Sequence, residues 1–175
     1  MNQARFVPYN DSHRTEFAQM NTEYITWMCD SLLNHYNFDL MHYLNLNGGI
    51  PKWVEDRINN ISPLSPPEGN LYIIETTEGI AGMGAIHKLG SDVGEIKGMF
   101  NRPEFRGNGY GKRMVNLLLE DGKRLGCTSF KLDTPKWALA AQHIYKSLGF
   151  IEREIYTESE IPPFIQLYWI WMEKL

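Results

Sequence analysis

The chain has 175 residues, 43% of them hydrophobic and 13% aromatic, which predicts a single folded domain over residues 1–175 rather than a disordered chain. Its formal net charge of −4 and its lack of a polybasic segment argue against nucleic-acid and anionic-membrane partners. The spacing of Cys29, Cys127 and the histidines argues against a disulfide scaffold or a metal site, and the lack of a signal-peptide pattern or a long apolar run predicts a soluble cytoplasmic protein.

The first half of the chain is expected to contain one strand followed by helices. The expected elements are a strand at residues 5–9, a helix from an N-cap at residues 10–12 to about Leu33, and two short helices at residues 39–46 and 51–61. Glycine and proline pairs predict breaks at residues 48–49 and 62–67.

The second half of the chain is expected to form most of a sheet. The expected elements are strands at residues 71–76, 80–89 and 93–101, a helix at 112–125, a strand at 128–133, a helix at 137–148, and strands at 150–157 and 166–172. The first three of these strands are joined by tight turns, so we expect them to be antiparallel. The helical crossover from strand 93–101 to strand 128–133 predicts one parallel pair, with a ligand site at its carboxyl end.

Residues 106–111 read Arg-Gly-Asn-Gly-Tyr-Gly and lie where that crossover leaves the strand. Alternating glycines allow positive φ angles and a close approach of the backbone to a ligand, and the first N–H groups of a helix attract anions. Arg106 and Lys112 add positive charge at either end of the loop. The loop fits neither a P-loop nor a dinucleotide fingerprint. It predicts a phosphate site of unnamed type, with a glycine-rich turn that binds nothing as the alternative.

Two motifs of the second half together resemble the GNAT superfamily of N-acetyltransferases. Residues 106–111 match its acyl-CoA loop, Q/R-x-x-G-x-G/A, and residues 141–150 are similar to its later pattern, A-x-x-x-Y-x-x-x-G-F. Two motifs in the expected order and at the expected distance are more specific than either alone. The resemblance implies an α/β (α+β) GNAT-like fold, with a mixed, mostly antiparallel sheet of about seven strands, helices on both faces and a splayed central strand pair.

The resemblance also implies that acetyl-CoA is the acyl donor. The residues implied to contact acetyl-CoA are Met99, Phe100, Asn101, Arg106, Gly107, Asn108, Gly109, Tyr110, Gly111, Lys112, Thr134, Ala141 and Tyr145. Gly98 independently indicates a bulge, because a glycine inside a strand often marks one, and a bulge could aim the N–H of Met99 or Phe100 at the thioester oxygen. Many members carry an Asn where this chain has Ala138, and Thr134 or Gln142 could replace that Asn.

Two residues are expected to handle the protons of the reaction. Tyr145 matches the tyrosine with which the family protonates the CoA thiolate, and core packing is its alternative. Glu95 lies where the histone-acetylating branch carries its general base, and we expect a partly buried carboxylate with a raised pKa. The alternative for Glu95 is a solvated strand residue or an ion-pair partner of Lys97 or Lys88.

The function implied is transfer of an acetyl group to a primary amine of a small molecule or amino acid, by direct attack in a ternary complex. Aromatic and apolar residues are candidates for the acceptor pocket, with core packing as the alternative: Tyr24, Trp27, Met28, Tyr36, Trp53, Tyr156, Phe164 and Trp169. Glu158 and Glu160 could attract the amine. A non-catalytic acyl-CoA-binding regulatory module and a peptide or protein N-acetyltransferase are the competing functions. The oligomeric state stays open, a homodimer included.

Overall fold

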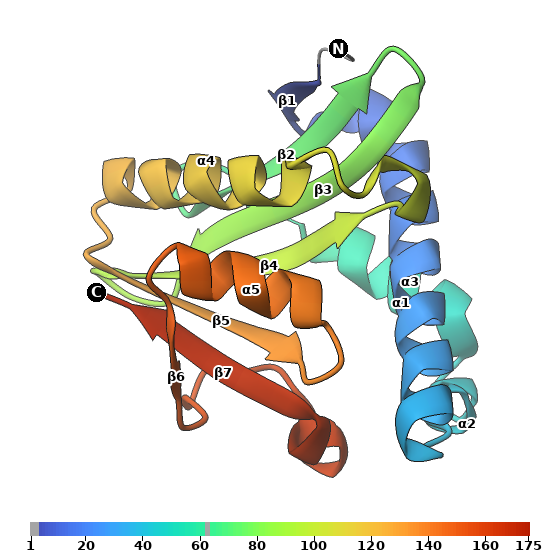
Figure 1. Ribbon diagram of the computed structural model, residues 1–175. Coiled ribbons are helices and arrows are strands. Elements are labelled where there is room, and N and C mark those ends of the chain that lie inside the picture. The colour runs from blue at the N-terminus through green and yellow to red at the C-terminus, as the bar shows by residue number, and fades with distance from the viewer. Residues whose placement is uncertain (1–3, 62–63) are drawn as a thin grey trace.

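The computed structural model describes residues 4–61 and 64–175, and its centre is one mixed sheet (Figure 1). The strands are β1 (Arg5–Pro8), β2 (Gly69–Thr76), β3 (Gly79–Lys88), β4 (Val93–Asn101), β5 (Ser129–Pro135), β6 (Ile151–Arg153) and β7 (Trp169–Lys174). The strand order is β1-β2-β3-β4-β5-β7-β6, and only the β4–β5 pair is parallel. The seven-stranded, mostly antiparallel sheet with one parallel crossover is confirmed.

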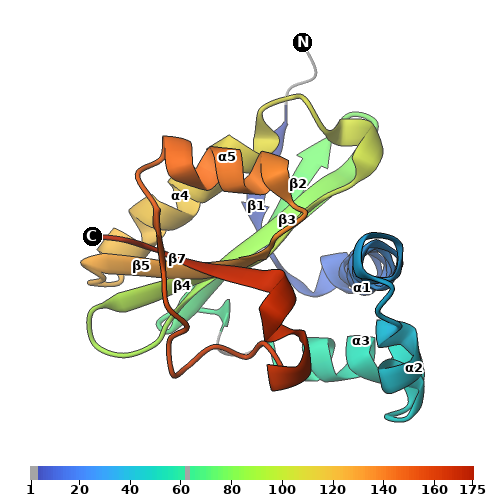
Figure 2. The same ribbon diagram turned by 60° about the horizontal axis from the view of Figure 1, so that its bottom comes forward.

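Helices cover both faces of this sheet. They are α1 (Arg14–Tyr36), α2 (Leu40–Asn45), α3 (Gly49–Asn59), α4 (Tyr110–Arg124) and α5 (Leu139–Ser147), with short 3-10 helices η1 (Asp11–His13), η3 (Pro103–Phe105) and η4 (Pro163–Tyr168). Figures 1 and 2 show α4 and α5 on one face and α1 to α3 on the other. Among residues 4–61 and 64–175, no helix is long and apolar enough to span a bilayer.

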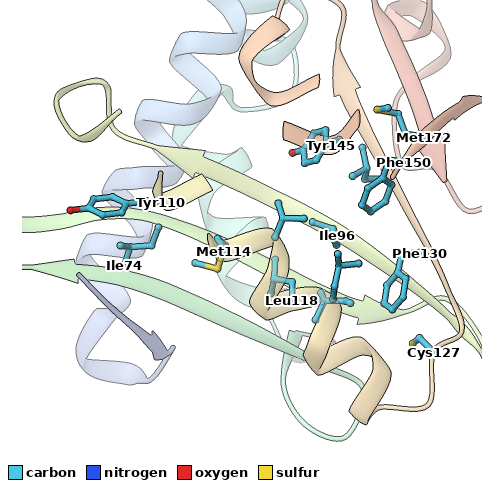
Figure 3. Packing of buried hydrophobic residues seen from close by; sticks show 14 of the residues in the cluster. Ile74, Ile96, Tyr110, Met114, Leu118, Cys127, Phe130, Tyr145, Phe150 and Met172 are labelled. Carbon is cyan, nitrogen blue, oxygen red and sulfur yellow. The ribbon is translucent and has the colours of Figure 1, made fainter. Parts of the chain in front are cut away.

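The two faces are built by alternation along the strands. Ile74 packs with Met114 and Leu118 of α4, in the cluster drawn in Figure 3. Its neighbour Ile73 packs with the α1 side chains on the opposite face. Successive strand residues point to opposite faces, so two adjacent buried isoleucines require cover on both sides. The sheet is therefore the middle layer of three.

The strands β4 and β5 separate part-way along their length. They pair only over residues 93–95 of β4 and 129–131 of β5. Beyond that point β4 stays paired with β3, and β5 stays paired with β7. The splayed central pair implied by the resemblance is thus confirmed, and the carboxyl ends of two neighbouring strands are left facing each other without backbone hydrogen bonds between them.

Several predicted boundaries were wrong. The helix α3 begins at Gly49, inside a predicted break, because Gly48 takes a left-handed conformation (φ 90°) and the helix starts directly after it. The strand β6 ends at Arg153 instead of residue 157, and β7 starts at Trp169 instead of residue 166. Between them the chain leaves the sheet and forms η4. The break predicted at residues 62–67 lies partly outside the described residues.

Candidate active site

The loop at residues 106–111 has the backbone geometry of an anion site. Gly107 and Gly109 have φ angles of 81° and 75°, and a Cβ atom built on either would meet no atom within 4 Å. Gly109 is the N-cap of α4 and supplies no side-chain hydrogen bond to the first turn of the helix. The two glycines therefore leave open space at the start of α4, where a phosphate group would fit.

Two side chains of this loop form hydrogen bonds to backbone carbonyl oxygens and so hold the loop in place. Arg106 Nε donates to the Asn101 carbonyl oxygen (3.1 Å), and Asn108 Nδ2 donates to the Phe105 carbonyl oxygen (3.1 Å). Tyr110 is buried in the core, whereas Lys112 is exposed beside the loop. Among these predicted cofactor contacts, backbone amides of the loop and the exposed side chains of Arg106 and Lys112 are available to a ligand.

Asn101 joins the end of β4 to the glycine loop. With its amide nitrogen turned to the Phe100 carbonyl oxygen (3.1 Å), its side-chain oxygen faces the Gly111 N–H (3.2 Å). An aliphatic side chain at this position could not form the bridge. Asn101 therefore has a structural role at the start of the glycine loop.

The bulge predicted at Gly98 is confirmed. Gly98 has a φ angle of 63°, and the β3–β4 register shifts there, so that Gly98 and Met99 lie opposite the single residue Gly84. Next to the bulge, a cavity of about 460 Å³ opens between the diverging strands β4 and β5. This central cavity is lined by β4, β5, α1, α2, α3, α5 and the segment before β7. Its lining includes Met99, Thr134 and Ala141 of the predicted cofactor contacts.

Tyr145 reaches the central cavity from α5. Its side chain is 5% exposed and packs edge-to-face on Phe150, with the ring centroids 6.0 Å apart. Burial raises the pKa of Tyr145, and the nearby Tyr24 and Asp133 raise it further. The phenol therefore keeps its proton at neutral pH, as a proton donor must.

Glu95 is enclosed by three donors. It accepts from the Tyr156 hydroxyl (2.6 Å), contacts His87 Nε2 (2.7 Å) and lies 3.3 Å from Lys97 Nζ. Burial raises the pKa of Glu95, but the His87 hydrogen bond, the Lys97 charge and the Tyr156 hydrogen bond outweigh burial and leave it lowered. The expected raised pKa was wrong, whereas the alternative of an ion pair with Lys97 is confirmed. The hydrogen bonds from His87 and Tyr156 were not predicted from the sequence.

Asp133 was missed by the sequence reasoning. It is half-buried on β5, lines the central cavity and accepts a hydrogen bond from Trp169. Burial raises the pKa of Asp133 to about 7, and the negative charge of Glu95 adds to this effect. The sequence did contain a signal for Asp133, because residue 133 ends a predicted parallel strand, where such sheets place their ligands.

Some of the other predicted residues line the cavity, and the rest lie outside it. Tyr24, Trp27, Met28, Trp53 and Phe164 line the central cavity. Among the described contacts, Tyr36 and Trp169 pack on Trp137, and Tyr156 binds Glu95. Glu160 lines the cavity and pairs with Lys97 (2.8 Å), whereas Glu158 lies 3.7 Å from Lys131.

The structure also shows the surroundings of Ala138 and of the two residues that could replace the asparagine expected at that position. Ala138 lines the central cavity, as does the buried Thr134. The amide nitrogen of Gln142 donates instead to the carbonyl oxygens of Pro135 (3.0 Å) and Lys136 (2.9 Å). Of the two proposed substitutes, Thr134 is therefore the better placed.

The model of the acetyltransferase (GNAT) family matches residues 25–150. The chain belongs to this family. It is 34% identical over 112 residues to an uncharacterised N-acetyltransferase of Schizosaccharomyces pombe, covering 62% of this chain and 69% of that protein. It is 24% identical over 95 residues to the IAA acetyltransferase of Azospirillum brasilense, covering 54% of this chain and 62% of that protein. The GNAT chain is thus an acyltransferase, as the two sequence motifs predicted.

Solved GNAT structures share the fold of this enzyme. An N-acetyltransferase of Thermoplasma acidophilum in complex with coenzyme A superposes with a TM-score of 0.72, at 13% identity over 98% of both chains. A spermidine N-acetyltransferase of Vibrio cholerae in complex with CoA and spermine gives a TM-score of 0.63, at 13% identity over 99% of this chain and 95% of that one. At such identities the likeness establishes the fold alone.

Proposed function

We propose that this GNAT enzyme transfers an acetyl group from acetyl-CoA to the primary amine of a small molecule, by direct attack within a ternary complex. The observation that carries the proposal is that Tyr145 and Asp133, a protonated phenol and a carboxylate with a pKa of about 7, line one cavity beside the strand bulge. Acetyl transfer to an amine needs one proton donor and one proton acceptor. At neutral pH Tyr145 holds a proton that it can donate, and Asp133 can be unprotonated and accept one.

The donor site is the glycine loop together with the end of β4. The amides of residues 107–110 would hold the pyrophosphate, with Lys112 beside them. Residues 99–101, with Thr134 and Ala141, would flank the pantetheine arm. Acetyl-CoA supplies the activated thioester, and an N–H of the bulged strand would support its oxygen.

Asp133 is the proposed proton acceptor. An amine is protonated at neutral pH and becomes nucleophilic only when it loses a proton, so a general base with a pKa near 7 is the most effective. Asp133 meets this condition, whereas the lowered pKa of Glu95 makes it the weaker base. Glu95 is kept as the second candidate for the base, because it also lines the central cavity.

Tyr145 is the proposed proton donor. When the bond from carbon to sulfur breaks and the bond from nitrogen to carbon forms, one proton must leave the nitrogen and one must reach the sulfur. Asp133 first takes the extra proton of the ammonium and passes it to water, and it then takes the proton that leaves the nitrogen during attack. Tyr145 gives a proton to the sulfur. Exchange with water then restores both side chains.

Incubation with acetyl-CoA and a panel of small amines and short peptides, followed by a thiol assay for released CoA, tests this function. We expect release with one or more small amines. Binding of acetyl-CoA without release on any acceptor would instead support a regulatory acyl-CoA-binding module, and release with peptides alone would support a peptide acetyltransferase.

A further inference from the structure

Arg57 of α3 carries a positive charge to the strand bulge. Its Nη2 lies 3.3 Å from the position that a Cβ atom of Gly98 would occupy, and its guanidinium lies 5.4 Å over the Trp53 ring. Arg57 is half-buried and lines the central cavity. It therefore lies close to the part of β4 where the acetyl group would be presented.

The Arg57 guanidinium has no carboxylate partner among the described residues. Its one hydrogen bond there is a long one, from Nε to Asn21 Oδ1 (3.5 Å). Other half-buried cations of the chain are paired: Arg102 with Glu16 and Glu23, and Lys97 with Glu95 and Glu160. A guanidinium offers five donors in a planar fork, and a carboxylate satisfies two of them at once.

Asp133 provides the opposite charge within the same cavity. Burial raises the pKa of Tyr24 to about 12, and the charges of Arg57 and Asp133 then act on this hydroxyl in opposite directions. Both charged groups are thus within electrostatic reach of one side chain of the cavity wall. A small molecule lying along Tyr24 can face the two of them together.

We propose that the acceptor is an amino acid or related amino-carboxylate, whose carboxylate binds Arg57, whose amine faces Asp133 and whose apolar part packs on Trp27, Trp53 and Phe164. The inference rests on the proposed acetyl transfer and narrows its substrate class. A polyamine fits poorly, because a second ammonium would approach the unpaired Arg57. The same cation attracts a carboxylate, which then fixes the position of the amine.

The test compares each standard L-amino acid with its primary amide, which keeps the amine and side chain and removes the negative charge. We expect the free acids that react to be preferred over their amides by tenfold or more in kcat/KM. Arg57→Gln is expected to lower kcat/KM for the acid by about 10- to 100-fold, mainly through KM, and to leave the amide within about threefold. Arg57→Lys, which keeps the charge without the fork, is expected to lie between the two.

Lys52→Gln is the matched control, because Lys52 is an exposed cation on the same helix that pairs with Asp56. We expect it to leave both substrates unchanged, and acetyl-CoA binding by calorimetry verifies folding of every variant. An equal loss for acid and amide in Arg57→Gln would overturn the carboxylate site. Turnover of amides or polyamines without turnover of free acids would also overturn it while leaving acetyl transfer standing. A lack of CoA release with every acceptor would defeat the proposed function itself, and this inference with it.

Discussion

The strands β4 and β5 each bring one carboxylate to the central cavity, and the two groups have different surroundings. Glu95 is enclosed by Tyr156, His87 and Lys97, within 3.3 Å or less of each. Asp133 accepts a hydrogen bond from Trp169 and lies in the field of Glu95. Burial raises the pKa of both groups, yet the pKa of Glu95 is lowered while that of Asp133 is raised to about 7.

The difference shows that burial alone does not set the proton affinity of a carboxylate. Hydrogen bonds and a cation favour the charged form, whereas a neighbouring negative charge opposes it. Glu95 is surrounded by hydrogen-bond donors and a cation, which lower its pKa. Its own negative charge then raises the pKa of Asp133. The more enclosed carboxylate therefore tunes the one that is open to a ligand.

The Asp133→Asn variant tests most directly whether Asp133, rather than Glu95, is the general base. As the general base, Asp133 must be unprotonated, so kcat/KM of the wild type is expected to rise with pH through about 7. Asparagine cannot accept the proton, and we expect a loss on the order of 10³-fold in kcat/KM and the disappearance of that rise. Steady-state kinetics between pH 5.5 and about 9 measure both.

An Asp133→Asn enzyme with wild-type activity and an unchanged pH profile would show that the base lies elsewhere. Glu95, Lys97, Glu160 and Trp169 all act on the Asp133 carboxylate. The mutated protein must therefore also be shown to bind acetyl-CoA like the wild type, so that a collapsed cavity is not mistaken for a lost base.

The Tyr145→Phe variant tests whether Tyr145 is the proton donor to the sulfur of CoA. The ring remains packed on Phe150, and only the hydroxyl in the cavity is lost. We expect kcat to fall about 100-fold, with little change in KM for the amine, because the thiolate then leaves without a proton. Tyr36→Phe is the control, since Tyr36 packs on Trp137 and Tyr168. Equal kinetics of the two variants would contradict a catalytic role for Tyr145.

The Glu95→Gln variant distinguishes the two candidate bases, because each of them predicts a different pH profile for this variant. If Glu95 acts through its charge, its removal lowers the pKa of Asp133, so the rise in kcat/KM moves to lower pH and the rate at neutral pH changes by about tenfold or less. If Glu95 is itself the base, activity is lost and does not return at high pH. Retained activity with the rise moved to lower pH supports Asp133 as the base, and activity that is lost at every pH supports Glu95.

How far the sequence predicts this site depends on the distance between interacting residues. The glycine loop is a local backbone feature, so residues 107–109 were readable directly, and Tyr145 was readable from one helical motif. Glu95 lines the central cavity, but its pKa depends on Tyr156, which lies 61 residues away and in a segment predicted to be a strand. Arg57 becomes significant only when α3 packs at the Gly98 bulge. Local patterns thus predicted the fold and the geometry of the glycine loop, whereas long-range contacts define the proposed acceptor side.

The smallest expected effect is that of Tyr156→Phe, which removes one of the three donors to Glu95 and keeps the ring. Because the Tyr156 hydrogen bond lowers the pKa of Glu95, its loss should raise that pKa. A lowered folded-state pKa contributes stability that is present above the unfolded pKa and is lost as pH falls through the folded value. Tyr156→Phe should therefore unfold at a higher pH than the wild type on acid titration, and should lose about 1 kcal/mol of stability at neutral pH.

Chemical denaturation at several pH values measures this effect, and Tyr36→Phe is again the control. Acetylation activity at neutral pH should stay within about threefold of the wild type, because Glu95 keeps His87 and Lys97 and remains charged. A large loss of activity without a loss of stability would mean that the Tyr156 hydroxyl takes part in the reaction itself. A loss of stability that is equal at all pH values would show that the hydroxyl stabilises the fold without acting on the Glu95 carboxylate, and the contrast between the two strands would then rest on His87 and Lys97.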